Sequence, residues 1–137
     1  RRQRQMCIRD RCVTVKRNDR TRSWHALKEA IRKEAQNQSG QLVIYPEGTR
    51  TIPGQEVEYK KGVLVLFSYL NRPLYLVSTN AGFAWSKTGK FKDNANASIN
   101  FIEKINYSKK GRYNLDHIKK KIERDSLRLF NKESARG

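Results

Sequence analysis

Apolar residues are arranged in two ways along the chain, at helical spacing and in short continuous runs. Two segments carry them at the three- and four-residue spacing of an amphipathic helix: 23–36 and a final segment that begins after Asn114. A further helix is predicted from about 61 to 70. Short apolar runs bounded by turn residues predict strands at 12–15, 41–45, 74–79 and 98–105. Strands that alternate with helices predict an α/β fold with a mixed, partly parallel sheet flanked by helices.

Polar and conformationally special residues mark the ends of these elements. Ser23 is a suitable N-cap for the first helix, and Asn114 is a suitable N-cap for the last. The sequence Asn71-Arg72-Pro73 ends the second helix, since proline cannot continue it. Segments 46–54 and 82–96 contain glycine, proline or polar residues at the positions typical of loops.

The composition limits the size and class of the domain. The chain has 137 residues and a formal net charge of +17, and 36% of its residues are apolar. That length fits one domain with one modest core. The longest apolar run, 63–67, is far shorter than the roughly 20 residues that span a bilayer, so we expect neither a transmembrane helix nor a signal peptide. Cys7 and Cys12 are too few for a disulfide framework or a zinc site without further ligands.

The first eleven residues differ from the rest. They read RRQRQMCIRDR, which resembles a sequencing adapter translated in one frame. We therefore divide the chain into an adapter-derived segment, 1–11, and a partial domain, 12–137. The alternative is a natural basic arm that binds phosphates. Without this segment the chain carries 25 basic and 12 acidic residues and has no initiator methionine, which predicts a gene fragment cut at its 5′ side.

The loop after the second predicted strand carries the residues best suited to chemistry. It reads Pro46-Glu47-Gly48-Thr49-Arg50. Ligands of open α/β sheets bind beyond the carboxyl ends of strands, so the loop is suitably placed. Gly48 allows unusual backbone angles or the close approach of a ligand. The planar guanidinium of Arg50 suits bidentate phosphate binding, although each residue alone also fits a turn with a solvated arginine.

Together with Tyr45, this loop resembles the Phe-Pro-Glu-Gly-Thr-Arg block of the glycerolipid acyltransferases, the family that includes 1-acylglycerol-3-phosphate acyltransferase. Two further blocks follow the order of that family. Val13-Thr14-Val15-Lys16-Arg17 is similar to an earlier strand that ends in arginine, and Lys61-Gly62 with the stretch 73–77 is similar to a later Lys-Gly and proline-flanked strand. The resemblance extends from about Cys12 to Ile105.

The sequence departs from the family pattern at two places. The later block usually has a second proline where this chain has Leu76. The catalytic His-x-x-x-x-Asp motif is missing, because His25 and His117 are followed at the fifth position by Ala30 and Ile122. In the family this motif precedes the earlier arginine block. We therefore expect the general base upstream of Cys12, and we interpret both histidines as surface or capping residues.

The resemblance implies the transfer of a fatty acyl group from acyl-CoA or an acyl carrier protein to a hydroxyl of 1-acylglycerol-3-phosphate or a similar phosphorylated acceptor, in phospholipid biosynthesis. It implies that Arg17 and Arg50 hold the acceptor phosphate. It also implies that Glu47 and Gly48 shape the acceptor pocket, and that Thr49 adds a hydroxyl contact. The reaction implied needs no metal and no organic cofactor.

The positive charge is consistent with two kinds of partner. Basic residues gather in four clusters: Lys16-Arg17-Arg20-Arg22, Lys87-Lys90-Lys92, Lys109-Lys110-Arg112 and Lys119-Lys120-Lys121. They suit an anionic membrane surface, which favours location at the cytoplasmic face of a membrane. The alternative is a small basic nucleic-acid-binding module, although no specific nucleic-acid motif is present. Convergence of Arg17 and Arg50 in one pocket would favour the phosphorylated acceptor.

Overall fold

The computed structural model describes residues 20–35, 41–49, 51, 55–86 and 88–135. The chain divides into two compact units, 1–43 and 44–137. The first contains the helix α2 (Arg20–Ala35). The second contains α3 (Gly62–Leu70), β1 (Leu74–Thr79), α4 (Ala81–Ala84), β2 (Ile99–Ile105) and α5 (Leu115–Ser134). None of the helices in the described residues combines the length and hydrophobicity needed to cross a bilayer.

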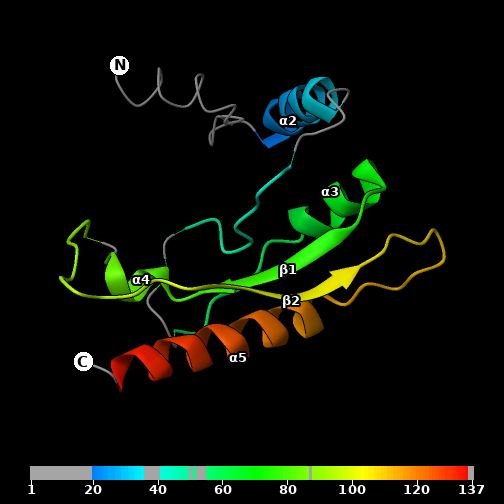
Figure 1. Ribbon diagram of the computed structural model, residues 1–137. Helices are drawn as coiled ribbons and strands as arrows, with labels where there is room; N and C mark the ends of the chain where they lie inside the picture. The colour runs from blue at the N-terminus through cyan, green and yellow to red at the C-terminus, as the bar shows by residue number, and fades with distance from the viewer. Residues whose placement is uncertain (1–19, 36–40, 50, 52–54, 87, 136–137) are drawn as a thin grey trace, which may run out of the picture. The chain divides into compact units, whose positions relative to one another are not determined.

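The α/β class is confirmed, and its sheet is antiparallel in the described residues. β1 and β2 form a two-stranded antiparallel sheet flanked by helices (Figure 1). Leu76 pairs with Glu103, whereas Val77 pairs with Phe101, so Ile102 is an extra residue that forms a bulge. Because β1 and β2 are antiparallel, the described strands show no parallel pairing. The predicted strand 12–15 lies outside the described residues.

The predicted strand 41–45 is wrong. This segment has no regular secondary structure, and Leu42, Val43 and Tyr45 are exposed. An apolar run has strand propensity, but it becomes a strand only where a neighbouring strand supplies backbone hydrogen bonds and a packed face. The sequence pattern of five residues cannot show whether such a neighbour exists.

The first helix begins earlier than the sequence predicted. α2 starts at Arg20, so Ser23 lies inside the helix and is not its N-cap. Residues 20–22 contain neither glycine nor proline, and nothing in them stops the helix from extending toward the N-terminus. The predicted helix 61–70, the strands 74–79 and 98–105 and the last helix lie within a residue of their observed positions. The predicted loop 82–96 contains most of the short helix α4.

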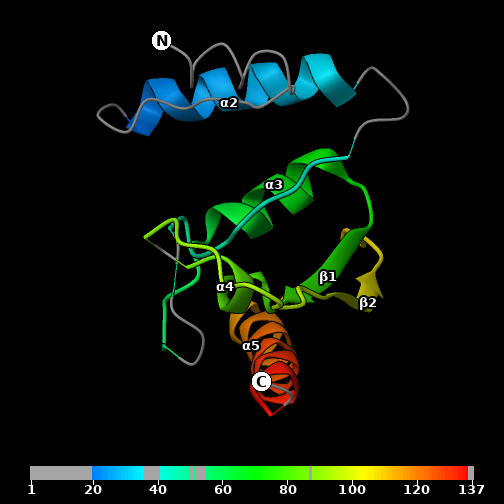
Figure 2. The ribbon, with the colours of Figure 1, turned by 60° about the vertical axis from the view of Figure 1, so that its left-hand side comes forward.

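α5 packs on the sheet, mainly on β1. Asn114 is its N-cap, as predicted, because its side-chain oxygen accepts hydrogen bonds from the backbone N–H groups of Asp116 and His117. Ile118 of α5 and Leu76 of β1 are buried. The ribbon views place α3 on the other side of β1 (Figure 2).

α3 is held by aromatic packing. The ring of Phe67 makes edge-to-face contacts with Tyr113 at 4.7 Å and with Tyr107 at 5.7 Å between centroids. Such pairs stabilise beyond their buried area. Asn71 ends the helix in a left-handed conformation, and its N–H donates to the carbonyl of Phe67. The helix is thereby fixed to the connection between β2 and α5.

The partly buried carboxylate of Asp125 joins both strands to α5. Ser78 Oγ and Asn100 Nδ2 donate to Asp125 Oδ2 at 2.5 and 2.6 Å, and Arg128 Nε donates to Oδ1 at 2.8 Å. The hydrogen bond from Asn100 lowers the pKa of Asp125 most, and those from Ser78 and Arg128 lower it further. These bonds favour the ionised carboxylate. Asp125 therefore links β1, β2 and α5 in its charged form.

Asp125→Ala should lower the free energy of unfolding at neutral pH by about 1–3 kcal/mol, because it leaves the Ser78 hydroxyl and the Asn100 amide without their acceptor. The pKa of Asp125 is lower in the folded than in the unfolded state. Its contribution is thus complete above about pH 4, the unfolded pKa, and declines as the pH falls toward the folded pKa. Urea unfolding of both proteins across this range measures the difference. The same substitution at Asp116, which is exposed on the same helix, is the control; a pH-independent difference would contradict the assignment.

Candidate functional site

The Pro46-Glu47-Gly48 segment forms a tight turn after the extended stretch. The Gly48 N–H donates to the Tyr45 carbonyl at 3.1 Å, which closes a β-turn with Pro46 in its second position. Glu47 is not among the residues with positive φ, so the turn has the character of type I, in which proline is favoured at this place. Gly48 itself has φ +65°, a left-handed conformation that other residues adopt only with strain. The sequence had indicated this role for Gly48.

A second segment, 55–60, holds the turn in place. The Lys60 N–H donates to the Pro46 carbonyl at 2.8 Å. A β-carbon built on Gly48 would lie 3.9 Å from Cγ of Lys60, so the aliphatic part of this side chain lies beside the turn. The aliphatic stem of Lys60 thus packs against the turn at Gly48. It directly precedes Lys61-Gly62, the block that leads into α3.

Tyr59 is buried beneath the turn and bonds to Glu47. Only 4% of its surface is exposed. Its hydroxyl lies in hydrogen-bonding contact with the Glu47 carboxylate. Burial raises the pKa of the hydroxyl most, and the negative charges of Glu47 and Glu123 raise it further. Tyr59 therefore stays protonated and can donate to the Glu47 carboxylate.

α5 contributes further charges to the surroundings of Tyr59. Lys119 Nζ lies 3.6 Å from Oε1 of Glu56 and 3.9 Å from Oε1 of Glu123. Burial raises the pKa of Glu123 most, while Lys119 lowers it and the charges of Glu56 and Glu47 raise it. The carboxylates around Tyr59 would repel a phosphate. An anionic ligand would therefore bind less favourably on the side of the turn that faces these carboxylates.

The structure describes three of the five predicted binding residues. Glu47, Gly48 and Thr49 are adjacent in one turn, and Gly48 and Thr49 are exposed. Arg17 and Arg50 lie outside the described residues, so their convergence stays a prediction. Both histidines, His25 and His117, are exposed, as the interpretation of them as surface residues requires.

The sequence analysis missed Tyr59, Lys60 and Glu123. A usable signal existed for Tyr59, because Val57 and Tyr59 alternate with charged residues, which is typical of an extended segment with one buried face. Lys60 has no signal beyond its place next to the Lys-Gly block. Glu123 lies beside an apolar helix position, and only the tertiary structure brings it to Tyr59.

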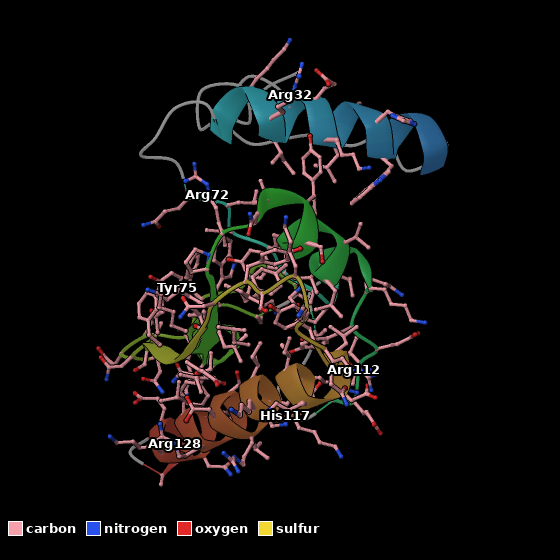
Figure 3. All side chains as sticks on the ribbon, turned by 90° about the vertical axis from the view of Figure 1, so that its right-hand side faces the viewer. Arg32, Arg72, Tyr75, Arg112, His117 and Arg128 are labelled. Carbon is pink, nitrogen blue, oxygen red and sulfur yellow. The ribbon has the colours of Figure 1, made fainter. Side chains whose placement is uncertain are left out.

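The described basic residues include a separate group on α5. A surface hollow of about 490 Å³ is lined by His117, Lys120, Lys121 and Arg124. Figure 3 shows His117 and Arg128 on α5, away from each other along the helix. Glu47, Gly48 and Thr49 do not line this hollow. In the described part of the chain, no three His, Cys, Asp or Glu side chains are grouped so that they could hold a metal ion.

The comparison with protein families decides the class of the chain. The family model described as Acyltransferase matches residues 2–80, more than half of the sequence. The chain belongs to the acyltransferase family. The match contains the turn at Gly48, Tyr59 and Lys60, the Lys61-Gly62 block and all of β1.

The acyltransferase match also bears on the limits of the domain. It begins within the segment 1–11 that resembles an adapter, and the division at residue 12 stays a prediction. β2 and α5 lie beyond its end, so the structure alone relates them to the site. No curated protein and no solved structure matches this acyltransferase chain. Nothing in the comparisons supports the nucleic-acid-binding alternative.

Proposed function

We propose that this acyltransferase chain carries the acceptor-binding part of an enzyme of phospholipid biosynthesis that acts at the cytoplasmic face of a membrane. The acceptor is 1-acylglycerol-3-phosphate or a similar phosphorylated glycerolipid, and the donor is acyl-CoA or an acyl carrier protein. The observation that carries the proposal is the hydrogen-bonded turn at Gly48. It lies inside the family match, its Glu47 lies in contact with the buried Tyr59, and the aliphatic part of Lys60 lies beside it.

The proposed reaction divides its work between two parts of the enzyme. A histidine expected upstream of Cys12, oriented by its aspartate, removes the proton of the acceptor hydroxyl. The oxygen then attacks the thioester carbonyl, and the tetrahedral intermediate collapses and releases the thiol of the carrier. Arg17 and Arg50 hold the acceptor phosphate, Thr49 contacts it through its hydroxyl, and Glu47 and Gly48 shape the pocket. Such positioning makes the attack effectively intramolecular.

The carboxylates near the turn are consistent with this division. They would repel a phosphate, but Tyr59 lies in contact with Glu47, and the backbone hydrogen bond from Lys60 to Pro46 ties the turn to segment 55–60. A pocket that is ordered before binding loses less entropy when the acceptor enters. Lys60, whose aliphatic stem lies beside the turn, adds a positive charge to this part of the chain. In the proposed enzyme, the acidic residues are therefore a support for the clamp.

Arg50→Lys tests the phosphate contact in the enzyme with its upstream half restored. Lysine keeps the charge but loses the planar fork, so it cannot replace a bidentate contact. Losing one charge-assisted hydrogen bond should lower kcat/KM for the phosphorylated acceptor about 10- to 100-fold. Acyl transfer to a monoacylglycerol without phosphate, and thioester hydrolysis by water, should change little.

The matched control is Arg112→Lys, an exposed arginine beyond the family match. It should leave kcat/KM for both acceptors unchanged. If Arg50→Lys lowers transfer to both acceptors and hydrolysis equally, Arg50 supports the fold and the clamp is wrong.

A further inference from the structure

A short hairpin, residues 84–92, projects from the connection between β1 and β2. Lys92 N–H donates to the carbonyl of Ala84, and Ser86 N–H donates to that of Lys90, each at 2.9 Å. Trp85 and Phe91 face each other in an isolated antiparallel bridge. Gly89 closes the tip with φ +84° and donates to the Ser86 carbonyl at 2.9 Å. The hairpin therefore has a defined backbone at each of its described residues.

The hairpin holds two aromatic rings in the solvent. Trp85 is 50% exposed and Phe91 is 72% exposed. Their rings stack at 5.1 Å between centroids with an angle of 19° between the planes. The two side chains thus form one continuous apolar surface on one face of the hairpin. Exposed tryptophan and phenylalanine together are unusual on a charged protein and indicate an interaction site.

The base of the hairpin is fixed to α5. The ring of Phe83 packs edge-to-face on Phe130 at 5.4 Å between centroids. Lys92 Nζ lies 4.0 Å from the centre of the Phe83 ring. Beyond the hairpin, Glu133 of α5 accepts from the backbone and side-chain N–H groups of Asn96 at 3.1 and 3.0 Å. These contacts attach both ends of the hairpin to α5.

The positive charge of the hairpin indicates an anionic partner. The hairpin sequence contains three lysines, and Asp93, the next residue, is the nearest acidic residue in sequence. Lys90 and Lys92 are exposed in the same hairpin. Tryptophan and phenylalanine partition into the boundary between headgroups and acyl chains, and lysine binds anionic headgroups. A second copy of this chain is a poor partner, because each copy carries a charge of +17.

We propose that the hairpin is a membrane anchor that inserts Trp85 and Phe91 into the headgroup region of an anionic bilayer, while Lys90 and Lys92 bind lipid phosphates. The proposed anchor rests on the proposed function, because an enzyme with a lipid acceptor needs a surface that brings it to the membrane. Membrane binding does not require turnover, so the two proposals can fail separately.

The test measures binding of the chain to vesicles of phosphatidylcholine with and without phosphatidylglycerol by cosedimentation. The double variant Trp85→Ala/Phe91→Ala should lower the partition coefficient at least about tenfold. Lys90→Gln/Lys92→Gln should lower it about fivefold per lysine, and only with phosphatidylglycerol at low salt. The control is Phe101→Ala, since Phe101 is also 72% exposed but lies on β2. It should bind as the parent does, and thermal unfolding should show that all variants fold.

A second measurement reports on the tip directly. The chain has two tryptophans, so Trp24→Phe leaves Trp85 as the sole indole reporter. Its emission should shift to the blue on vesicle binding and be quenched by brominated lipids. The proposal is overturned if Phe101→Ala weakens binding as much as the double variant, or if Trp85 emission is unchanged in the bound protein. It is also overturned if the double variant loses binding to a single-stranded oligonucleotide but keeps binding to vesicles.

Discussion

Purified protein of residues 1–137 is expected to transfer no acyl group from acyl-CoA to lysophosphatidic acid above the uncatalysed background. The family places its general base in a His-x-x-x-x-Asp motif, and neither histidine of this chain has an aspartate at the required spacing. Loss of a general base removes about 10²–10⁴-fold in rate. His25 and His117 are exposed, and neither belongs to the turn at Gly48.

Radiometric detection of the acylated product measures this activity, and three further samples make the result decisive. His25→Ala and His117→Ala should behave as the parent does. Fusion of an upstream segment that carries the motif should restore product formation. Robust turnover by residues 1–137 that disappears in one histidine variant would instead identify that histidine as the base and contradict the expectation.

Leu76→Ala should lower the free energy of unfolding by about 2–5 kcal/mol, the range for leucine truncations that leave a cavity. Leu76 is only 2% exposed. It lies on the face of β1 that also carries Ser78, which bonds to α5, so truncation opens a space between sheet and helix. Small domains have a free energy of unfolding of about 5–15 kcal/mol, so the loss is a large part of the whole.

Urea denaturation followed by circular dichroism measures the change in stability. The control is Leu127→Ala on α5, because this leucine is 43% exposed. Truncation there should cost about 1 kcal/mol or less. Equal losses at the two positions would show that the space between β1 and α5 is not the main core of this unit.

The sequence predicted those elements that carry their own local signals. β1 lies where expected because its apolar run is bounded by Pro73 and by the polar Asn80. α5 begins where expected because Asn114 caps it and its apolar residues recur with helical spacing. The strand predicted at 41–45 is wrong because strand formation depends on a neighbouring strand, which the local sequence cannot show.

In the candidate site, too, only features with a local sequence signal could be predicted. Gly48 could be assigned a special backbone role because glycine adopts backbone angles that other residues avoid. The alternating pattern could predict that Tyr59 is buried, but no motif predicts its contact with Glu47, because the two residues belong to separate segments. The positions of Arg17 and Arg50 stay predictions, because both lie outside the described residues.

The single pairing of β2 affects how this protein should be handled. Within the described part of the chain, β2 pairs with β1 alone, and a strand at the edge of a sheet offers its backbone groups to other chains. Glu103 and Lys104 charge one half of the strand, whereas Ile99 and Phe101 leave the other half apolar and exposed. Repulsion between molecules of charge +17 then prevents strand-to-strand aggregation. Because salt screens this repulsion, concentrated stocks should keep better at low ionic strength than in the high-salt buffers customary for basic proteins.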